Sequence, residues 1–289
     1  MDGSYLPYPL DVYSLAELYK EVIGDRRNNS NIFQQFNEII RTAANITSLT
    51  EANQSVVNAY CVRRSSVVLS EGLNKIWATV ELYSQLKGRC PICDSFNSGF
   101  LTSTTIPTLH YANMSLLISL LTLIGVILSR NRRGDQFIYL RQGDNLTKFS
   151  RTKYIRWLTG SNQGRGNWHQ DLITIARNLL PNLPIIIEFD KLDCIRKIRN
   201  YLHYSILSSE TLLAQFAEGN YTRCLKVSLD LADTIFKFLR SDLRITSFRE
   251  DIFKRYEQLN KKGQEIISYY NRSLAQLSRV PDCHCINDL

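Results

Sequence analysis

The stretch Arg196-Lys-Ile-Arg199-Asn200-Tyr-Leu-His203-Tyr204 carries the most specific pattern in the chain, and we expect it to be helical. Successive residues of a helix are rotated by about 100° around its axis. One face therefore collects four polar side chains, which are Arg196, Arg199, Asn200 and His203. The arginine guanidinium can donate two hydrogen bonds to phosphate oxygens, and the histidine imidazole exchanges a proton near neutral pH. These groups suit metal-independent cleavage of an RNA phosphodiester, although a solvated helix face would have the same composition.

This arrangement resembles the signature of the HEPN (higher eukaryotes and prokaryotes nucleotide-binding) family, in which an arginine precedes a histidine on a helix. Arg196 and His203 match its spacing, whereas Arg199 and Asn200 match its arginine–polar pair, so either arginine can take the family role. The resemblance implies an endoribonuclease that needs no catalytic cofactor and leaves a 2′,3′-cyclic phosphate. Asn200 would then orient the histidine or bind the phosphate. It also implies a homodimer with one composite cleft, a toxin–antitoxin or antiviral defence context, and an inhibitory or activating protein partner.

The composition is that of a globular protein with enough apolar residues for a sizeable core. Of 289 residues, 44% are hydrophobic, while 13 glycines and 7 prolines are few for a turn-rich β fold. Apolar residues recur at helical spacing in Val12–Ile23, Ile32–Ile40, Glu51–Leu86, Leu109–Ser129, Asp171–Leu180, Phe189–Leu207, Leu212–Phe216, Tyr221–Arg240 and Phe248–Leu277. The strand candidates are Phe137–Leu140 and Leu183–Phe189, and Pro184 weakens the second. We therefore predict an all-α fold, a helical bundle with a HEPN-like core and additional flanking helices.

We expect three regions along the chain. Residues 1–105 form an N-terminal helical region that ends in a Cys-x-x-Cys knuckle. Residues 106–245 form the HEPN-like core, and the helix near Asp230–Arg240 is the final packing helix that the resemblance implies. Residues 246–289 form a C-terminal helix and a Cys-His-Cys tail.

Most of the excess positive charge lies at residues 130–177, where ten basic residues accompany three aspartates and the whole chain has a formal net charge of +8. Aromatic residues are interleaved with them. Basic side chains can neutralise phosphates and aromatic rings can stack on bases, so such stretches often bind single-stranded nucleic acid. We predict an irregular insertion whose nucleic-acid contacts are Arg130, Arg132, Arg133, Arg141, Lys148, Arg151, Lys153, Arg156, Trp157, Arg165 and Trp168. The alternative is a solvated connection whose aromatic side chains pack inward.

Cys90-Pro-Ile-Cys93 places two thiolates at the spacing of a zinc knuckle. One pair is half of a tetrahedral site, and Cys283-His284-Cys285 could supply the rest. We therefore predict a structural zinc ion held by Cys90, Cys93, Cys283 and Cys285. The alternative is that these are ordinary unpaired cysteines. No βαβ pattern surrounds the first pair, which disfavours a redox role.

The segment Leu101–Ser129 contains no Asp, Glu, Lys or Arg, and Met114–Leu128 is almost entirely apolar. That apolar run is shorter than the roughly 20 residues needed to cross a bilayer. We favour a buried core helix over a membrane span. The first residues have no basic start followed by an apolar run, so we expect no secretory signal and a cytoplasmic protein.

Two further functions fit the sequence. The first is a non-catalytic nucleic-acid- or protein-binding subunit of a larger complex, which binds through Arg130–Arg177. The second is a membrane-associated effector built around Leu109–Ser129. The sequence has no His-Glu-x-x-His motif and no carboxylate cluster spaced for Mg²⁺, so metal-dependent nuclease chemistry has no support in it.

Overall fold

The computed structural model describes residues 29–43, 45–85, 95–130, 135–160, 168–180, 185–204, 210–241 and 250–277. Within these ranges the side chains of residues 29–30, 95–103, 201–204, 210–220, 241, 250–251 and 273–277 are not described. The predicted helix at Val12–Ile23 therefore lies outside the described residues.

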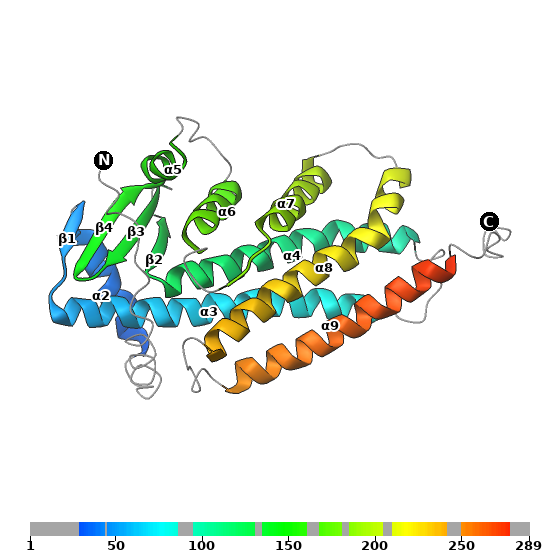
Figure 1. Ribbon diagram of the computed structural model, residues 1–289, viewed down its shortest axis with the longest axis horizontal. Helices are drawn as coiled ribbons and strands as arrows, with labels where there is room; N and C mark the ends of the chain where they lie inside the picture. Colours follow the sequence, from blue (N-terminus) through cyan, green and yellow to red (C-terminus); the bar gives the residue numbers. More distant parts are fainter. Residues whose placement is uncertain are drawn as a thin grey trace. The chain divides into compact units, whose positions relative to one another are not determined.

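The described chain is mainly helical, as predicted, and it also contains a small antiparallel sheet (Figure 1). The helices are α2 (Asn29–Thr42), α3 (Glu51–Ser84), α4 (Ser95–Leu123), α5 (Arg151–Thr159), α6 (Trp168–Leu179), α7 (Phe189–Tyr204), α8 (Glu210–Ser241) and α9 (Glu250–Leu277). Their positions confirm the helices predicted from apolar periodicity in α2, α3, α6, α7 and α9. The two segments predicted between residues 212 and 240 belong to one helix, α8.

The prediction of an all-α fold with an irregular insertion was wrong at residues 126–160. This part forms three strands, β2 (Val126–Arg130), β3 (Gln136–Gln142) and β4 (Asn145–Ser150), followed directly by α5. A fourth strand, β1 (Ile46–Ser48), completes a sheet of order β1-β4-β3-β2. Four consecutive β3 residues, Ile138–Arg141, are buried because both faces of this strand are covered. A strand covered on both faces lacks the alternation that marks a half-exposed strand.

Of the two strand candidates, Phe137–Leu140 is confirmed within β3, whereas the described residues 185–188 of the second form no strand. The helix predicted to reach Ser129 ends earlier. α4 stops at Leu123, and Gly125 has a φ of 84°, a left-handed conformation that glycine adopts without strain. The chain then enters β2, where Val126 and Ile127 pair with β3.

Within the described residues, one segment, Thr104–Leu123 of α4, is long and apolar enough to cross a membrane. Of that window, 83% is buried inside the structure, as in the core helix of a soluble protein. Ser119 on this helix exchanges two hydrogen bonds with Ser65 of α3, each 2.9 Å between the hydroxyl and the partner's backbone oxygen. These contacts agree with the favoured interpretation of a buried core helix.

The chain divides into two compact units, each assembled from separate parts of the sequence. Unit 1 comprises the described parts of Met1–Ser70, Ser115–Ile187 and Thr234–Ile252, and unit 2 those of Glu71–Met114, Glu188–Asp233 and Phe253–Leu289. The boundaries expected after residues 105 and 245 remain a prediction.

In unit 1, α2 and the first turns of α3 cover one face of the sheet (Figure 1). This core consists of Phe36, Leu49, Val57, Cys61, Ile127, Tyr139 and Leu146. α5 packs on the opposite face, where the ring centroids of Phe149 and Tyr154 are 5.4 Å apart. The sheet is thus enclosed over most of its area, and β1 covers only part of the outer edge of β4.

Unit 2 contains helical segments from α3, α4, α7, α8 and α9. Tyr83 of α3 stacks on Tyr221 of α8 with 3.4 Å between ring centroids. α8 and α9 run side by side (Figure 1), and Gly263 of α9 lies directly against Leu229 of α8. These contacts join α3, α8 and α9 in the unit that also contains α7, the helix with the polar face identified in the sequence.

Candidate functional site

The polar face of α7 is partly turned toward the protein interior. Leu192 and Ile195 are buried, as their apolar side chains require, and Arg196 and Arg199 lie within the same buried stripe, 9% and 4% exposed. Asp190, Lys191, Cys194 and Lys197 form the exposed side of the helix. His203 lies in the last turn of α7, and its side chain is outside the described ones.

Arg196 is held by an acidic residue of its own helix. Its Nε donates a hydrogen bond to Asp193 Oδ1 at 2.8 Å, one turn earlier, and Lys197 lies 3.2 Å from the other carboxylate oxygen. Burial alone would raise the pKa of Asp193, but the hydrogen bonds and charges of these two cations outweigh it and lower that pKa. The pair therefore fixes the guanidinium of Arg196 through its Nε atom.

Arg199 and Asn200 differ from Arg196 in their surroundings. The Arg199 guanidinium carbon lies 5.5 Å from the ring centroid of Tyr111 on α4, a cation–π contact inside unit 2. The Oδ1 atom of Asn200 is fully buried and accepts no hydrogen bond from any described residue. Of the three described side chains, Arg199 has the surroundings of a packing residue, Arg196 is paired with Asp193, and Asn200 keeps a buried oxygen that accepts no hydrogen bond from the described residues.

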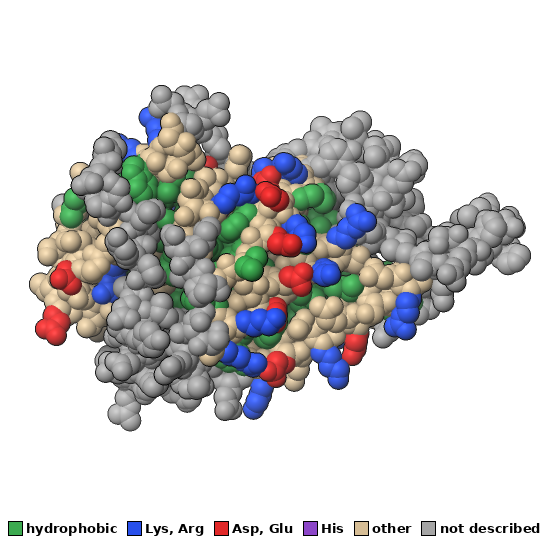
Figure 2. Space-filling model, viewed as in Figure 1, with side chains coloured by type: hydrophobic (Ala, Val, Ile, Leu, Met, Phe, Trp, Pro, Cys, Tyr) green, Lys and Arg blue, Asp and Glu red, His purple; other side chains and the backbone are tan. Residues whose placement is uncertain are grey.

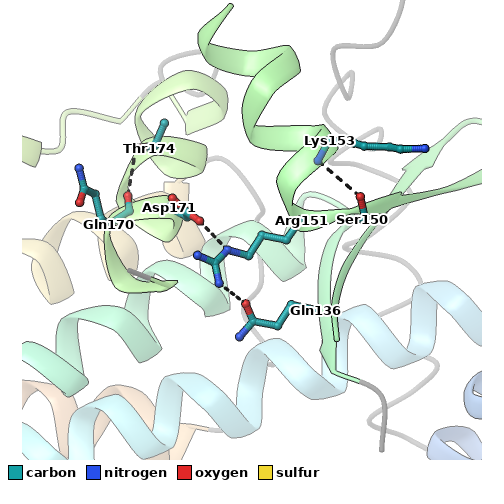
Figure 3. Close-up of polar contacts among 7 residues, drawn as sticks. All are labelled: Gln136, Ser150, Arg151, Lys153, Gln170, Asp171 and Thr174. Atoms are coloured by element: carbon teal, nitrogen blue, oxygen red, sulfur yellow. Dashed lines mark hydrogen bonds and ion pairs between the residues drawn. The ribbon is translucent and has the colours of Figure 1, made fainter. Parts of the chain in front are cut away.

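Arg151, one of the predicted nucleic-acid contacts, forms an internal ion pair. Figure 3 shows its guanidinium between Asp171 and Gln136, with Nε 2.5 Å from Asp171 Oδ2. Its guanidinium carbon also lies 5.5 Å from the ring of Trp168. Burial raises the pKa of Asp171 despite the opposing effect of Arg151. Arg151 thus joins α5, α6 and β3 within unit 1.

Arg141 is also internal. Only 6% of its surface is exposed, and its Nε and Nη1 atoms have no hydrogen-bond partner among the described residues. It lies on the face of β3 that packs against α3, close enough to Cys61 for their charges to interact. Arg141 therefore has the position of an internal residue of unit 1, and its role in nucleic-acid binding stays a prediction.

The remaining predicted contacts have different positions. Arg130, Lys153 and Arg156 are exposed, Lys148 and Trp157 are half-buried, and Arg132, Arg133 and Arg165 lie outside the described residues. Lys148 and Lys153 both line a pocket of about 410 Å³ at the outer edge of β4. Figure 3 shows the Lys153 side chain extending away from the Arg151–Asp171 pair.

That pocket also contains residues that the sequence did not indicate as one group. Asn45 and Ile46 come from the start of β1, Phe137 from β3, and Ser150 from the end of β4. The sequence indicated Phe137 only as the start of a strand candidate and as one of several interleaved aromatic residues. No sequence signal joins it to Ile46, because the two meet only through strand pairing across about ninety residues of chain.

The charged side chains do not form one continuous basic surface on the face drawn in Figure 2. Lysine and arginine side chains alternate there with acidic ones along the described helices. In unit 2, Lys262 lies 2.5 Å from Glu81, and Lys75 lies 2.5 Å from Glu71. Whether a lysine or arginine side chain has a neighbouring carboxylate therefore differs from one residue to the next.

Comparison of the chain with family models, curated proteins and solved structures gave no match. Its function must therefore be argued from its own residues.

The predicted zinc ligands Cys90, Cys93, Cys283 and Cys285 lie outside the described residues. Over the parts of the chain that the structure does describe, no group of three or more His, Cys, Asp or Glu residues is placed to hold a metal ion. Cys61 and Cys224 are buried, and burial raises the pKa of each thiol to about 12. These two thiols are packing groups, and the zinc site stays a prediction.

Proposed function

We propose that this protein is a metal-independent endoribonuclease of HEPN type, in which Arg196 binds the scissile phosphate and His203 transfers protons. The observation that supports it best is the Arg196–Asp193 pair. This pair fixes the guanidinium of Arg196 through its Nε atom. A guanidinium held in place before substrate arrives stabilises a developing charge without further reorganisation.

The proposed reaction is an intramolecular transfer of the phosphoryl group. An imidazole takes the proton from the ribose 2′-hydroxyl, and the 2′-oxygen attacks phosphorus. The bond from phosphorus to the 5′-oxygen breaks, and a second imidazole gives its proton to that leaving oxygen. The products are a 2′,3′-cyclic phosphate and a 5′-hydroxyl. Because base and acid are both needed, we propose that a second copy of the chain supplies the second His203.

The surroundings of Arg196 and Arg199 favour Arg196 for the phosphate-binding role. Arg199 is 4% exposed and packs against the Tyr111 ring, so we assign it to stabilising α7 on α4. Asn200 has an unbonded buried oxygen one turn before His203, which suits a group that orients the imidazole. The proposal also places the protein in the cytoplasm, with RNA as its substrate.

Labelled single-stranded RNA incubated with purified protein in EDTA tests this function. We expect wild-type protein to cut the RNA and to leave a cyclic phosphate. His203→Ala and Arg196→Ala should each lower the rate by about 10²-fold or more. Lys197→Ala is the matched control, because it removes a neighbouring exposed cation of the same helix and should change the rate by less than about threefold.

Three results would contradict the proposal: no cleavage in EDTA, cleavage of RNA whose 2′-hydroxyls are replaced by hydrogen, or full activity of His203→Ala. Arg199→Ala provides a separate comparison. We expect it to lower the melting temperature, since it removes a buried packing contact.

A second candidate is a non-catalytic RNA-binding subunit. The burial of Arg196 and Arg199, which are 9% and 4% exposed, favours it, because a scissile phosphate must reach a catalytic guanidinium. RNA binding by the wild type without cleavage, and with equal affinity in His203→Ala, would support this candidate and exclude the nuclease.

A further inference from the structure

The pocket at the outer edge of β4 exists because β1 is shorter than β4. β1 pairs with β4 at Asn145–Thr147, and Lys148 N donates one more hydrogen bond to Asn45 O at 2.8 Å. Beyond this point no described strand covers the edge of β4 at Ser150. The opening of about 410 Å³ lies there and falls within the range of small-ligand sites.

The charge of this pocket is uncompensated. Lys148 and Lys153 line it, and none of its described lining residues is acidic. Neither ammonium forms an ion pair with a carboxylate of the described chain, in contrast to Lys75, Lys191 and Lys262. Two cations that line the same opening and form no ion pair with the described residues favour an anionic ligand.

The pocket also has an exposed apolar part. Ile46 is 55% exposed on β1, and Phe137 is half-buried, with its ring beneath the Lys148 ammonium at 4.7 Å from Nζ to the centroid. A ring that interacts with a cation can also accept a flat aromatic group. The ligand should therefore combine an anion with an aromatic ring.

The start of α5 also favours an anionic ligand. Ser150 is its N-cap and accepts a hydrogen bond from Lys153 N at 3.4 Å. The cap satisfies one backbone N–H of the first turn, and the end of the helix still carries partial positive charge. Lys153 thus belongs to the first turn at a helix end that itself attracts anions.

We propose that this pocket binds one nucleotide of single-stranded RNA, with the base on Phe137 and the phosphate between Lys148 and Lys153. The Lys148 ammonium moves from the ring to the phosphate when the base arrives. Aromatic stacking with backbone neutralisation is how proteins bind single strands without reading sequence. The choice of RNA over DNA rests on the proposed function. The lining of the pocket, in contrast, contains no residue of α7.

The test measures binding of a labelled 2′-O-methyl oligouridylate, which the proposed reaction cannot cut, to the full chain by fluorescence anisotropy. We expect Lys148→Gln with Lys153→Gln to raise Kd by tenfold or more. The slope of log K against log salt should also fall by about 0.7, because the contact with one phosphate is lost. Phe137→Leu should raise Kd by about fivefold or more and leave the slope unchanged, since it removes stacking and not charge.

Arg41→Gln is the matched control. It removes one exposed cation from the last turn of α2, outside the pocket lining, and should change Kd by less than twofold. If Arg41→Gln weakens binding as much as the double lysine variant does, the charge acts diffusely and the inference is overturned. Binding of an acidic peptide that RNA cannot displace would also overturn it. The lysine variants change surface side chains, so they remain informative if Phe137→Leu fails to fold.

Binding and cleavage are measured separately. A protein that binds through this pocket but does not cut RNA overturns the proposed nuclease and leaves the pocket assignment intact. A protein that cuts RNA while its binding is insensitive to the pocket variants overturns the pocket assignment alone.

Discussion

Arg141 and Arg151 have the same charge and lie ten residues apart, yet their positions have opposite consequences for stability. Arg151 is matched by Asp171 and Gln136, whereas Arg141 is buried and two of its nitrogens have no partner among the described residues. Burial lowers the pKa of the Arg141 guanidinium, although the charges of Cys61 and Asp144 oppose this. A buried cation without compensation costs free energy.

We expect Arg141→Met to raise the free energy of unfolding by about 1–2 kcal/mol, because methionine fills similar space without a charge to desolvate. The same change at Arg151 should lower it by about 3 kcal/mol, since Asp171 would stay buried and unpaired. Urea unfolding of both variants measures the difference. If both variants lowered the free energy of unfolding by the same amount, Arg141 would have a compensating partner.

At the scale of elements, the packing of α8 on α9 depends on Gly263. A Cβ at this position would lie 2.6 Å from Leu229 Cδ1, and Leu229 is 1% exposed, so its side chain has little room to move. Alanine normally favours a helix over glycine by about 1 kcal/mol. Here the close approach of the two helices opposes that gain.

We therefore expect Gly263→Ala to lower the free energy of unfolding by about 1–2 kcal/mol, measured by urea unfolding. In the background of Leu229→Ala, which removes the clashing methyl groups, the same change should be neutral or stabilising. A double-mutant cycle isolates this coupling. A stabilising effect in the wild-type background would mean that α8 and α9 are not in close contact at this point.

At the scale of the whole molecule, the proposed cleft requires two copies of the chain. With RNA in large excess over protein, a ninefold excess of His203→Ala should lower the cleavage rate of the wild type about tenfold, through random pairing of subunits. The RNA excess prevents the variant from acting by sequestering substrate. An unchanged rate would mean that each copy holds a complete site.

The helices could be predicted because helical periodicity is a local property. The apolar spacing in α3, α6 and α9 repeats every turn, so the pattern was visible without knowing what each helix packs against. The polar face of α7 followed from the same rotation, since positions 196, 199, 200 and 203 must share one side of a helix. Whether that side faces solvent could not be read from spacing.

The sheet could not be predicted in full because its strands are defined by distant partners. β1 pairs with β4 although about a hundred residues separate them, and β3 is enclosed on both faces. Its buried run of Ile138–Arg141 therefore includes an arginine and shows no alternation. The sequence identified the Phe137–Leu140 segment but not the sheet to which it belongs.

The amino-acid sequence by itself determined the helical segments, the concentration of positive charge at residues 130–177 and the shared face of Arg196 and Asn200. Only the tertiary structure decided which of those cations reach solvent. Arg151 is neutralised by Asp171 from α6, and Arg141 is covered by α3, whereas Lys148 and Lys153 stay open beside the short strand β1. The reason is that charge belongs to a residue, whereas exposure depends on which distant segments pack over it.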